Sequence, residues 1–444
     1  MIQRLIQKLN QSGNSYSLLA NGLFAAFGLG TFLVLTRKLN QEIFGLWVLF
    51  ITISSLLDML RLGLTGTATI RILSSSHHSK KTEIIGTSYR LSITATMVMS
   101  AILLSLFAII NHWLTGNPYR YILLFYPLLA VVNLPIHQSL VIAQGFINFK
   151  KVFVIRTITG VSSFVSMLIC VVWVDNNIIT LLITYIIAHA FTSIIIILLR
   201  WDGIGSLSKF NNNIKKQIMH FGKYATASYI GSNLLRSSDT IILSMAAFMG
   251  AEAIAIYAIP MKFVEAVEIP LRSFSATAFP RLSSLWSKNK KQFYQTLKKY
   301  TVYTTLLLIP VVTVVATFPE FFLLILGGKN FIEHLHTQKS IAFVLCIYIL
   351  VLPLDRYSGI ALFALNLPRE NFIKISVMLI SNVIFNLVAI YYFKSLTAMA
   401  LATLIFTILG IFIGWHKTFK CIPGEHVSLK HALQKTIHKA LAFK

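Results

Sequence analysis

Long apolar stretches recur along the whole chain and are separated by short polar interruptions. A helix needs about 20 apolar residues to cross a hydrocarbon core of roughly 30 Å, and each stretch approaches or exceeds that length. The predicted spans are 15–36, 46–70, 84–110, 119–142, 152–174, 178–199, 222–248, 253–279, 300–326, 339–365, 371–393 and 397–416. The pattern therefore predicts an all-α polytopic membrane protein with about twelve transmembrane helices.

Composition supports this interpretation, because 56% of the residues are hydrophobic and only 12% are charged. A soluble globular protein of 444 residues is much less apolar than this. The first apolar stretch is long, lacks a small-residue cleavage site and is followed by further spans, so it is not predicted to be a cleaved signal peptide.

The basic residues are distributed asymmetrically between the two sides of the predicted membrane. Five of the 39 Lys and Arg residues lie deep inside the predicted spans, and of the others 28 fall on the side of the chain termini and six on the other side. By the positive-inside rule, both termini are predicted to lie in the cytoplasm. The predicted location is the inner membrane. The net charge of +25 is explained by this topology and by attraction to anionic membrane lipids. Because these residues are spread over short loops, nucleic acid is not an expected partner.

The predicted spans divide into two groups of six. Residues 15–200 form the predicted N-terminal bundle and residues 222–416 the C-terminal bundle, joined by a cytoplasmic loop at 201–221. Residues 1–14 and 417–444 are predicted to be basic amphipathic segments at the membrane surface. In the tail, the apolar residues with helical spacing are Leu429, Leu433, Ile437 and Leu441.

A shift of 210 residues aligns parts of the two halves. The shift places Gly45-Leu46-Trp47 on Ala255-Ile256-Tyr257, Asp58 on Glu268, and Arg71 on Arg281. Apolar helices also align by coincidence, but a matched acid and a matched arginine at one offset favour a duplication. Halves with an even number of spans would share one orientation in the membrane.

Ten ionisable residues lie inside the predicted spans. They are Asp58, Arg61, Arg236, Asp239, Lys262, Glu265, Glu268, Arg272, Asp355 and Arg356. Each would cost roughly 2.5–3.5 kcal/mol at the bilayer centre, so about 25–35 kcal/mol would be lost if all ten faced lipid. These residues must pair with one another or face a wet interior, which indicates transport of something polar.

Helical spacing allows four ion pairs within single helices. Asp58–Arg61, Arg236–Asp239 and Lys262–Glu265 are three residues apart, and Glu268–Arg272 are four apart, so each pair shares a helix face. Such pairs could simply stabilise helices in the bundle, or they could line a cavity. For the set as a whole a polar central cavity is the favoured interpretation.

Asp355 and Arg356 are sequence neighbours and point about 100° apart on a helix, so each needs a partner from another helix. Pro353 predicts a kink or local unwinding beside them. Arginine suits a diphosphate, because its planar fork binds oxyanions bidentately. The predicted substrate-binding cations are Arg61, Arg236, Lys262, Arg272 and Arg356, and the predicted charge partners are Asp58, Asp239, Glu265, Glu268 and Asp355.

The sequence contains no convincing metal or cofactor motif. Cys170, Cys346 and Cys421 have no paired spacing, and His77-His78 is better explained as a solvated turn than as a metal site. No predicted outward loop is long enough for a catalytic domain, so the chain is not predicted to be an enzyme. No cofactor is expected, and transport could be coupled to a proton or sodium gradient.

Several stretches resemble Wzx-type O-antigen or polysaccharide repeat-unit flippases of the multidrug/oligosaccharidyl-lipid/polysaccharide exporter superfamily. The resembling stretches are Arg37–Trp47, the sequence Asp58-Met-Leu-Arg-Leu-Gly-Leu64, Arg236-Ser-Ser-Asp239, Tyr257, and Phe279-Pro-Arg-Leu282. The similarity covers almost the whole chain, although each motif is degenerate.

The resemblance implies two six-helix bundles in a V around a central cavity, operating by alternating access. It also implies translocation of undecaprenyl-diphosphate-linked oligosaccharide from the cytoplasmic to the periplasmic leaflet. Under that interpretation the protein is a monomer, and a polysaccharide polymerase and a chain-length regulator are candidate partners.

Three other classes of membrane protein are alternatives to a repeat-unit flippase. A cation-coupled multidrug exporter of the same superfamily would be expected to have an acid early in the first span, where this chain has Asn21 and no carboxylate. A flippase for a cell-wall precursor resembles a longer bundle with extra helices. A polysaccharide polymerase or ligase would need a large periplasmic loop, and none is predicted here.

Overall fold

The computed structural model describes residues 13–75, 80–114, 117–174, 177–365 and 367–421. Every regular element in that part of the chain is helical. The long helices are α2 (Gly13–Lys38), α3 (Gln41–Ser75), α4 (Lys81–Ile110), α5 (Tyr119–Gly145), α6 (Phe149–Trp173), α7 (Ile178–Leu198), α8 (Asn212–Met245), α9 (Gly250–Lys288), α10 (Lys290–Thr317), α12 (Leu335–Ala364), α13 (Pro368–Leu387) and α14 (Leu396–Lys420). The shorter elements are η2 (Asn111–Leu114), η3 (Ile204–Ser206), η4 (Ala247–Met249), α11 (Pro319–Gly327), η5 (Lys329–His334) and the π-helical η6 (Val388–Tyr392). The all-α prediction is confirmed.

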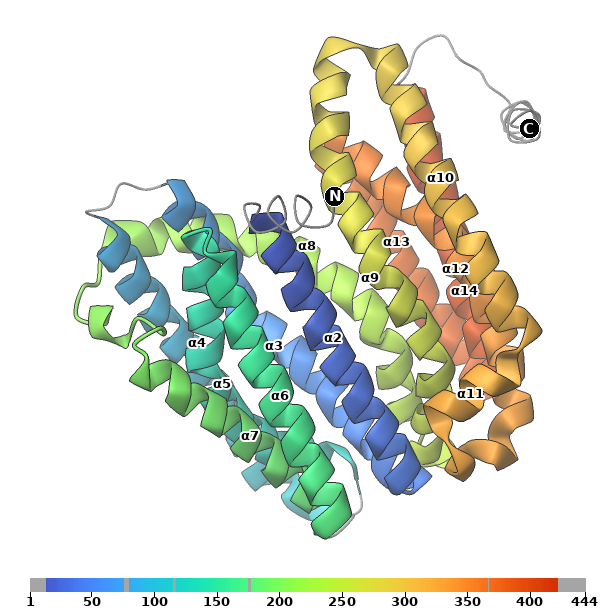
Figure 1. Ribbon diagram of the computed structural model, residues 1–444, viewed down its shortest axis with the longest axis horizontal. Helices are drawn as coiled ribbons and strands as arrows, with labels where there is room; N and C mark the ends of the chain where they lie inside the picture. Colours follow the sequence, from blue (N-terminus) through green and yellow to red (C-terminus); the bar gives the residue numbers. More distant parts are fainter. Residues whose placement is uncertain (1–12, 76–79, 115–116, 175–176, 366, 422–444) are drawn as a thin grey trace, which may run out of the picture.

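The helices form two bundles arranged as a V (Figure 1). Helices α2–α7 make the N-bundle and α8–α14 the C-bundle, and α3 packs along both α8 and α9 at the seam. The bundles meet where α2 ends and diverge toward the end where α2 begins. Equivalent helices pack in equivalent pairs, since α3 packs on α5 as α9 packs on α12, and α6 on α7 as α13 on α14. This correspondence supports the proposed duplication.

Ten helices of the described part are long and apolar enough to cross a membrane. Helices α8 and α9 are also long, but they fall outside that set and hold six of the ten charged residues singled out in the sequence. Helix α9 has 39 residues, which corresponds to about 58 Å and exceeds the hydrocarbon thickness of roughly 30 Å. Figure 1 shows the α9–α10 hairpin projecting at the open end of the V.

Two predicted boundaries were wrong. The predicted span 300–326 is interrupted, because α10 ends at Thr317 and α11 begins at Pro319. Proline lacks the backbone N–H that would continue a helix and restricts the residue before it, here Phe318. Helix α8 begins at Asn212, inside the predicted 201–221 loop, because the Asn211 side chain accepts hydrogen bonds from the amides of Asn213 and Ile214.

The two predicted amphipathic ends fall largely outside the described residues. Residues 1–12 and 422–444 belong to that undescribed part, while α2 already begins at Gly13 and α14 continues to Lys420. The surface-helix predictions for both ends therefore stay predictions.

Candidate functional site

Asp58 and Arg61 form the predicted ion pair on α3, with 2.7 Å between Arg61 Nη2 and Asp58 Oδ1. Tyr126 of α5 donates its hydroxyl to the same carboxylate oxygen at 2.9 Å. Arg61 Nη1 donates to Thr96 Oγ1 of α4 at 2.8 Å and to the backbone oxygen of Ala130 at 2.5 Å. The guanidinium is therefore held by three helices of the N-bundle.

The Arg61 side chain is fully buried, so the prediction that it lines a solvent-reachable cavity was wrong for this conformation. Its surroundings explain the difference. Toward the C-terminal end of α3, this helix and α4 are joined by Ser92–Thr65 and Thr69–Ser88 hydrogen bonds of 3.0 and 2.9 Å. These small hydroxyl residues, one helical turn apart, pack α4 closely against α3 and leave the arginine inside the bundle.

Glu268 lies between two arginines in the C-bundle. Arg272 Nη2 is 2.7 Å from Glu268 Oε2, and Arg356 Nη2 of α12 is 3.9 Å from Glu268 Oε1. The side chains of Arg272 and Arg356 are 52% and 36% exposed, whereas Glu268 is 12% exposed. The predicted Glu268–Arg272 pair and the predicted partner for Arg356 on another helix are both confirmed. We call these three residues the arginine pair site.

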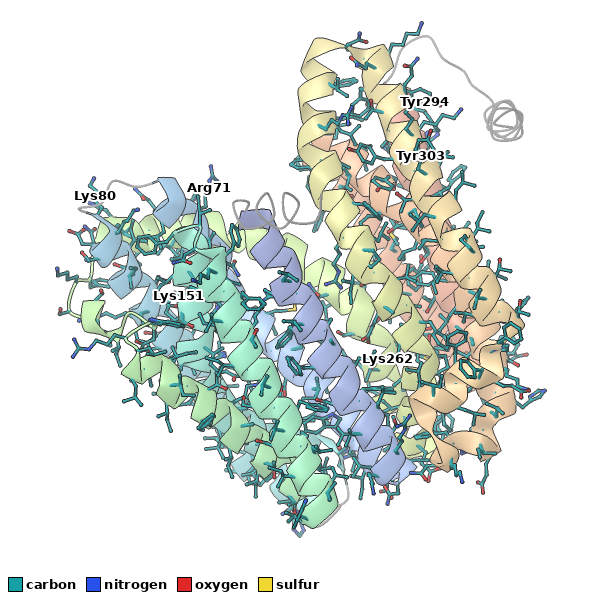
Figure 2. The ribbon with its side chains drawn as sticks, in the orientation of Figure 1. Arg71, Lys80, Lys151, Lys262, Tyr294 and Tyr303 are labelled. Carbon is teal, nitrogen blue, oxygen red and sulfur yellow. The ribbon has the colours of Figure 1, made fainter. Side chains whose placement is uncertain are left out.

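Lys262 and Glu265 form the third predicted pair, at 2.6 Å. The Lys262 ammonium also lies 4.7 Å from the ring centre of Phe32 on α2, which makes a cation–π contact between the two bundles. Figure 2 labels Lys262 where α9 lies beside α2. Glu265 is exposed, so this pair stands at a solvent-reachable edge of the seam.

Asp355 pairs with Lys374 of α13, a residue that the sequence had placed among the cytoplasmic loop cations. Lys374 Nζ is 2.6 Å from Asp355 Oδ1, and it also donates to Ser358 Oγ at 2.8 Å. Only 3% of Lys374 is exposed, so its side chain lies inside the C-bundle. Helix α12 continues through Pro353, so the chain is not unwound there, and the alternative of a kink stays a prediction.

Asp239 of α8 lies buried inside the C-bundle and accepts four hydrogen bonds from neutral groups. The donors are Asn382 Nδ2 (3.3 Å) and Asn386 Nδ2 (2.8 Å) of α13, Thr403 Oγ1 (3.2 Å) of α14 and the Tyr257 hydroxyl (3.1 Å) of α9. Of these donors, the sequence analysis had named only Tyr257. The sequence does contain one signal for this cluster, because the four-residue spacing of Asn382 and Asn386 places both on one helix face. The side chain of Arg236 lies outside the described part, so the predicted Arg236–Asp239 pair stays a prediction.

The Asp239 cluster contains oxygen atoms of the kinds that bind small hard cations. The carboxylate and two hydroxyl oxygens lie together, and the buried amide oxygens of Asn382 and Asn386 lack a hydrogen-bond partner among the described residues. Oxygen donors of this kind suit sodium, and a proton on Asp239 would satisfy the same carboxylate. Among the described residues there is no group of three His, Cys, Asp or Glu side chains that could hold a metal ion.

Comparisons with known proteins identify relatives at the level of family and fold. The profile of the family described as "Polysaccharide biosynthesis protein" matches residues 12–286. No curated protein matches the chain. The fold is similar to an inward-facing multidrug resistance MATE family transporter of the MOP superfamily, with a TM-score of 0.75, 12% identity, and coverage of 91% of this chain and 98% of that one.

Two further solved structures share the fold. Lipid II flippase MurJ in an inward closed conformation gives a TM-score of 0.70 at 14% identity, covering 90% of this chain and 86% of that one. An outward-facing MATE family transporter gives a lower TM-score of 0.65 at 12% identity, covering 94% and 97%.

Proposed function

Since the chain belongs to the polysaccharide biosynthesis protein family, we propose that it is a flippase for undecaprenyl-diphosphate-linked oligosaccharide. The substrate would be an O-antigen or related repeat unit, moved from the cytoplasmic to the periplasmic leaflet by alternating access. The fold shared with MOP superfamily transporters and with a lipid II flippase supports transport and not enzymatic turnover.

The arginine pair site is the observation on which the proposal depends. Two guanidinium groups share a single carboxylate, and both arginines are partly exposed. Within these three residues positive charge exceeds negative charge by one. A diphosphate can accept paired N–H donors from each planar fork, and Glu268 is then displaced from one arginine as the anion binds.

The packing at the seam fits a substrate with a lipid tail. Helix α3 packs along α8 and α9, whereas α2 packs along α6 and reaches the C-bundle chiefly through α11 and η5. The two sides of the seam therefore differ in how the bundles pack. On the side formed by α2 and α9, Lys262 lies over the ring of Phe32. A tail could stay in the bilayer beside α2 and α9 while the polar head group occupies the space between the bundles.

The Asp239 cluster is our candidate for coupling to a proton or sodium gradient. Asp239 lies on α8, whose earlier residues Ile214 and Ile218 belong to a hydrophobic cluster with α3, α4 and α5 of the N-bundle. Asp239 itself is bound by α9, α13 and α14 of the C-bundle. A cation at Asp239 would therefore act on the helix that is packed into both bundles.

The distribution of basic residues supports an inner-membrane location with both termini in the cytoplasm. The V would then be open to the cytoplasm, where lipid-linked precursors are made. Anionic membrane lipids, a polysaccharide polymerase and a chain-length regulator are the partners proposed for a monomeric flippase.

The test replaces Arg356 in purified protein reconstituted with a fluorescent undecaprenyl-diphosphate-linked glycan. Arg356→Ala should abolish movement of the glycan between leaflets, and Arg356→Lys should reduce it, because lysine keeps the charge and loses the fork. Arg369→Ala, an exposed arginine at the start of α13, is the matched control and should transport normally.

Wild-type transport by Arg356→Ala would remove this residue from the substrate site. If the wild-type protein moved small organic cations and not the glycan, the multidrug exporter would become the better interpretation. Covalent change of the glycan would instead indicate an enzyme.

A further inference from the structure

The end of α2 is capped by a residue from the other bundle. Asn330 of η5 donates its side-chain amide to the backbone oxygens of Thr36 (3.3 Å), Arg37 (3.3 Å) and Leu39 (3.0 Å). The last carbonyls of a helix have no partner inside that helix and need one from elsewhere. Here the C-bundle supplies that partner, although the helix belongs to the N-bundle.

Two more side chains join the same segments. Gln41 at the start of α3 donates from Nε2 to the Asn330 backbone oxygen at 2.6 Å, and its Oε1 lies 2.9 Å from His334 Nε2. Thr36 Oγ1 donates to the backbone oxygen of Leu326 at 2.7 Å. We call Thr36, Gln41, Asn330 and His334 the outer latch.

A tightly packed apolar layer lies beside the outer latch. Phe44 of α3 contacts Phe331 of η5 edge to face, with ring centres 6.1 Å apart, and also Phe32 of α2 at 5.1 Å. A side chain added at Gly45 would lie 1.9 Å from the backbone oxygen of Ala251, so the backbones of α3 and α9 are in direct contact. The closed end of the V is therefore packed as densely as a protein core.

We infer that the outer latch is the gate that holds this end of the V closed and that must separate during each transport cycle. The four latch side chains join the bundles by hydrogen bonds and form no ion pair with one another, and Arg37 Nη2 adds a longer contact of 3.4 Å to the backbone oxygen of Ile325. Asn330 is exposed, and water can replace its amide at the α2 carbonyls when the bundles part. This arrangement favours the closed state without making it permanent, as a gate in an alternating-access protein requires.

The first test joins the latch covalently. In a variant with the three native cysteines replaced by alanine, Gln41→Cys and His334→Cys are linked by a short, reducible bifunctional thiol reagent. Linked protein should lose transport and regain it on reduction, while each single-cysteine variant treated in the same way keeps its activity. Undiminished transport by the linked protein would overturn the inference.

The second test needs no substrate, so its outcome does not depend on the proposed function. Spin labels at Glu42→Cys and Glu333→Cys, both exposed positions, report the distance across the latch. Asn330→Ala should raise the ratio of separated to closed states by about tenfold, because three carbonyls lose their cap. The matched control is Asn40→Ala, which removes a 2.8 Å cap of the Ile43 amide within the N-bundle.

The control should leave the distance distribution unchanged. If Asn330→Ala and Asn40→Ala give the same distribution as the parent, Asn330 does not hold the gate and the inference fails.

Discussion

The two bundles place an acid at equivalent positions on α3 and α9, and each acid pairs with an arginine of its own helix, yet the two pairs have opposite environments. In the N-bundle, Arg61 is completely buried and Asp58 is 32% exposed. In the C-bundle, Arg272 is 52% exposed and Glu268 is 12% exposed. The distance within each pair is 2.7 Å, so the ion pair itself does not distinguish them.

The neighbouring helix makes the difference. Helix α5 brings the Tyr126 hydroxyl to Asp58 and the Ala130 carbonyl to Arg61. Helix α12 brings Arg356, a second cation that leaves Glu268 shared. The intrahelical pair is thus enclosed by neighbouring groups on α3, whereas on α9 it stands beside a second arginine.

Arginine-to-alanine substitutions in the two pairs should separate stability from transport. Arg61→Ala should lower the free energy of unfolding by about 3 kcal/mol, because it leaves Asp58 without its ion-pair partner inside the bundle. Arg272→Ala should cost less than about 1 kcal/mol, since that guanidinium is half exposed, but should abolish transport. Thermal unfolding in detergent and glycan transport in vesicles measure the two effects. A stable Arg61→Ala protein would contradict the comparison.

The sequence predicted the pairs but not their surroundings. Spacings of three and four fix Asp58–Arg61, Lys262–Glu265 and Glu268–Arg272, because helix geometry alone brings these side chains together. Helix α3 is apolar on most of its circumference, so its pattern does not say which face turns into the N-bundle. The burial of Arg61 therefore depends on tertiary packing by α4 and α5.

The sequence did not predict the partners of Lys374 or the Asp239 cluster, because these contacts also depend on tertiary packing. Lys374 is near the start of α13 and reads as a loop cation, but its partner Asp355 comes from α12. The Asp239 cluster draws its donors from α9, α13 and α14, a combination that no local spacing shows. By contrast, the break at Phe318-Pro319 was visible in the sequence, because proline within an apolar stretch often ends a helix.

Asp239 and Asp58 offer a second comparison, between a carboxylate with neutral donors and one paired with an arginine. All four described donors to Asp239 are uncharged, and in the proposed coupling a cation would bind this carboxylate. Asp239→Asn should fold and should lose the dependence of transport on an imposed sodium or proton gradient. Asp58→Asn is the control and should keep that dependence. Transport in vesicles under each gradient is the measurement, and a gradient response retained by Asp239→Asn would exclude this carboxylate as the coupling site.

The smallest effect on transport is expected from a substitution of Lys374. This substitution tests whether the buried Lys374–Asp355 pair of the C-bundle is structural, as we expect for Asp58–Arg61 in the N-bundle. Lys374→Met keeps the volume of the chain beside Gly414 and removes the bonds to Asp355 and Ser358. Asp355 is 25% exposed and can be hydrated, so we expect a loss of about 1–2 kcal/mol in stability and normal transport. Unfolding and transport are measured on the same preparation. A stable Lys374→Met protein without transport would extend the functional site from α9 and α12 to α13, and burial would no longer separate structural from substrate-binding cations.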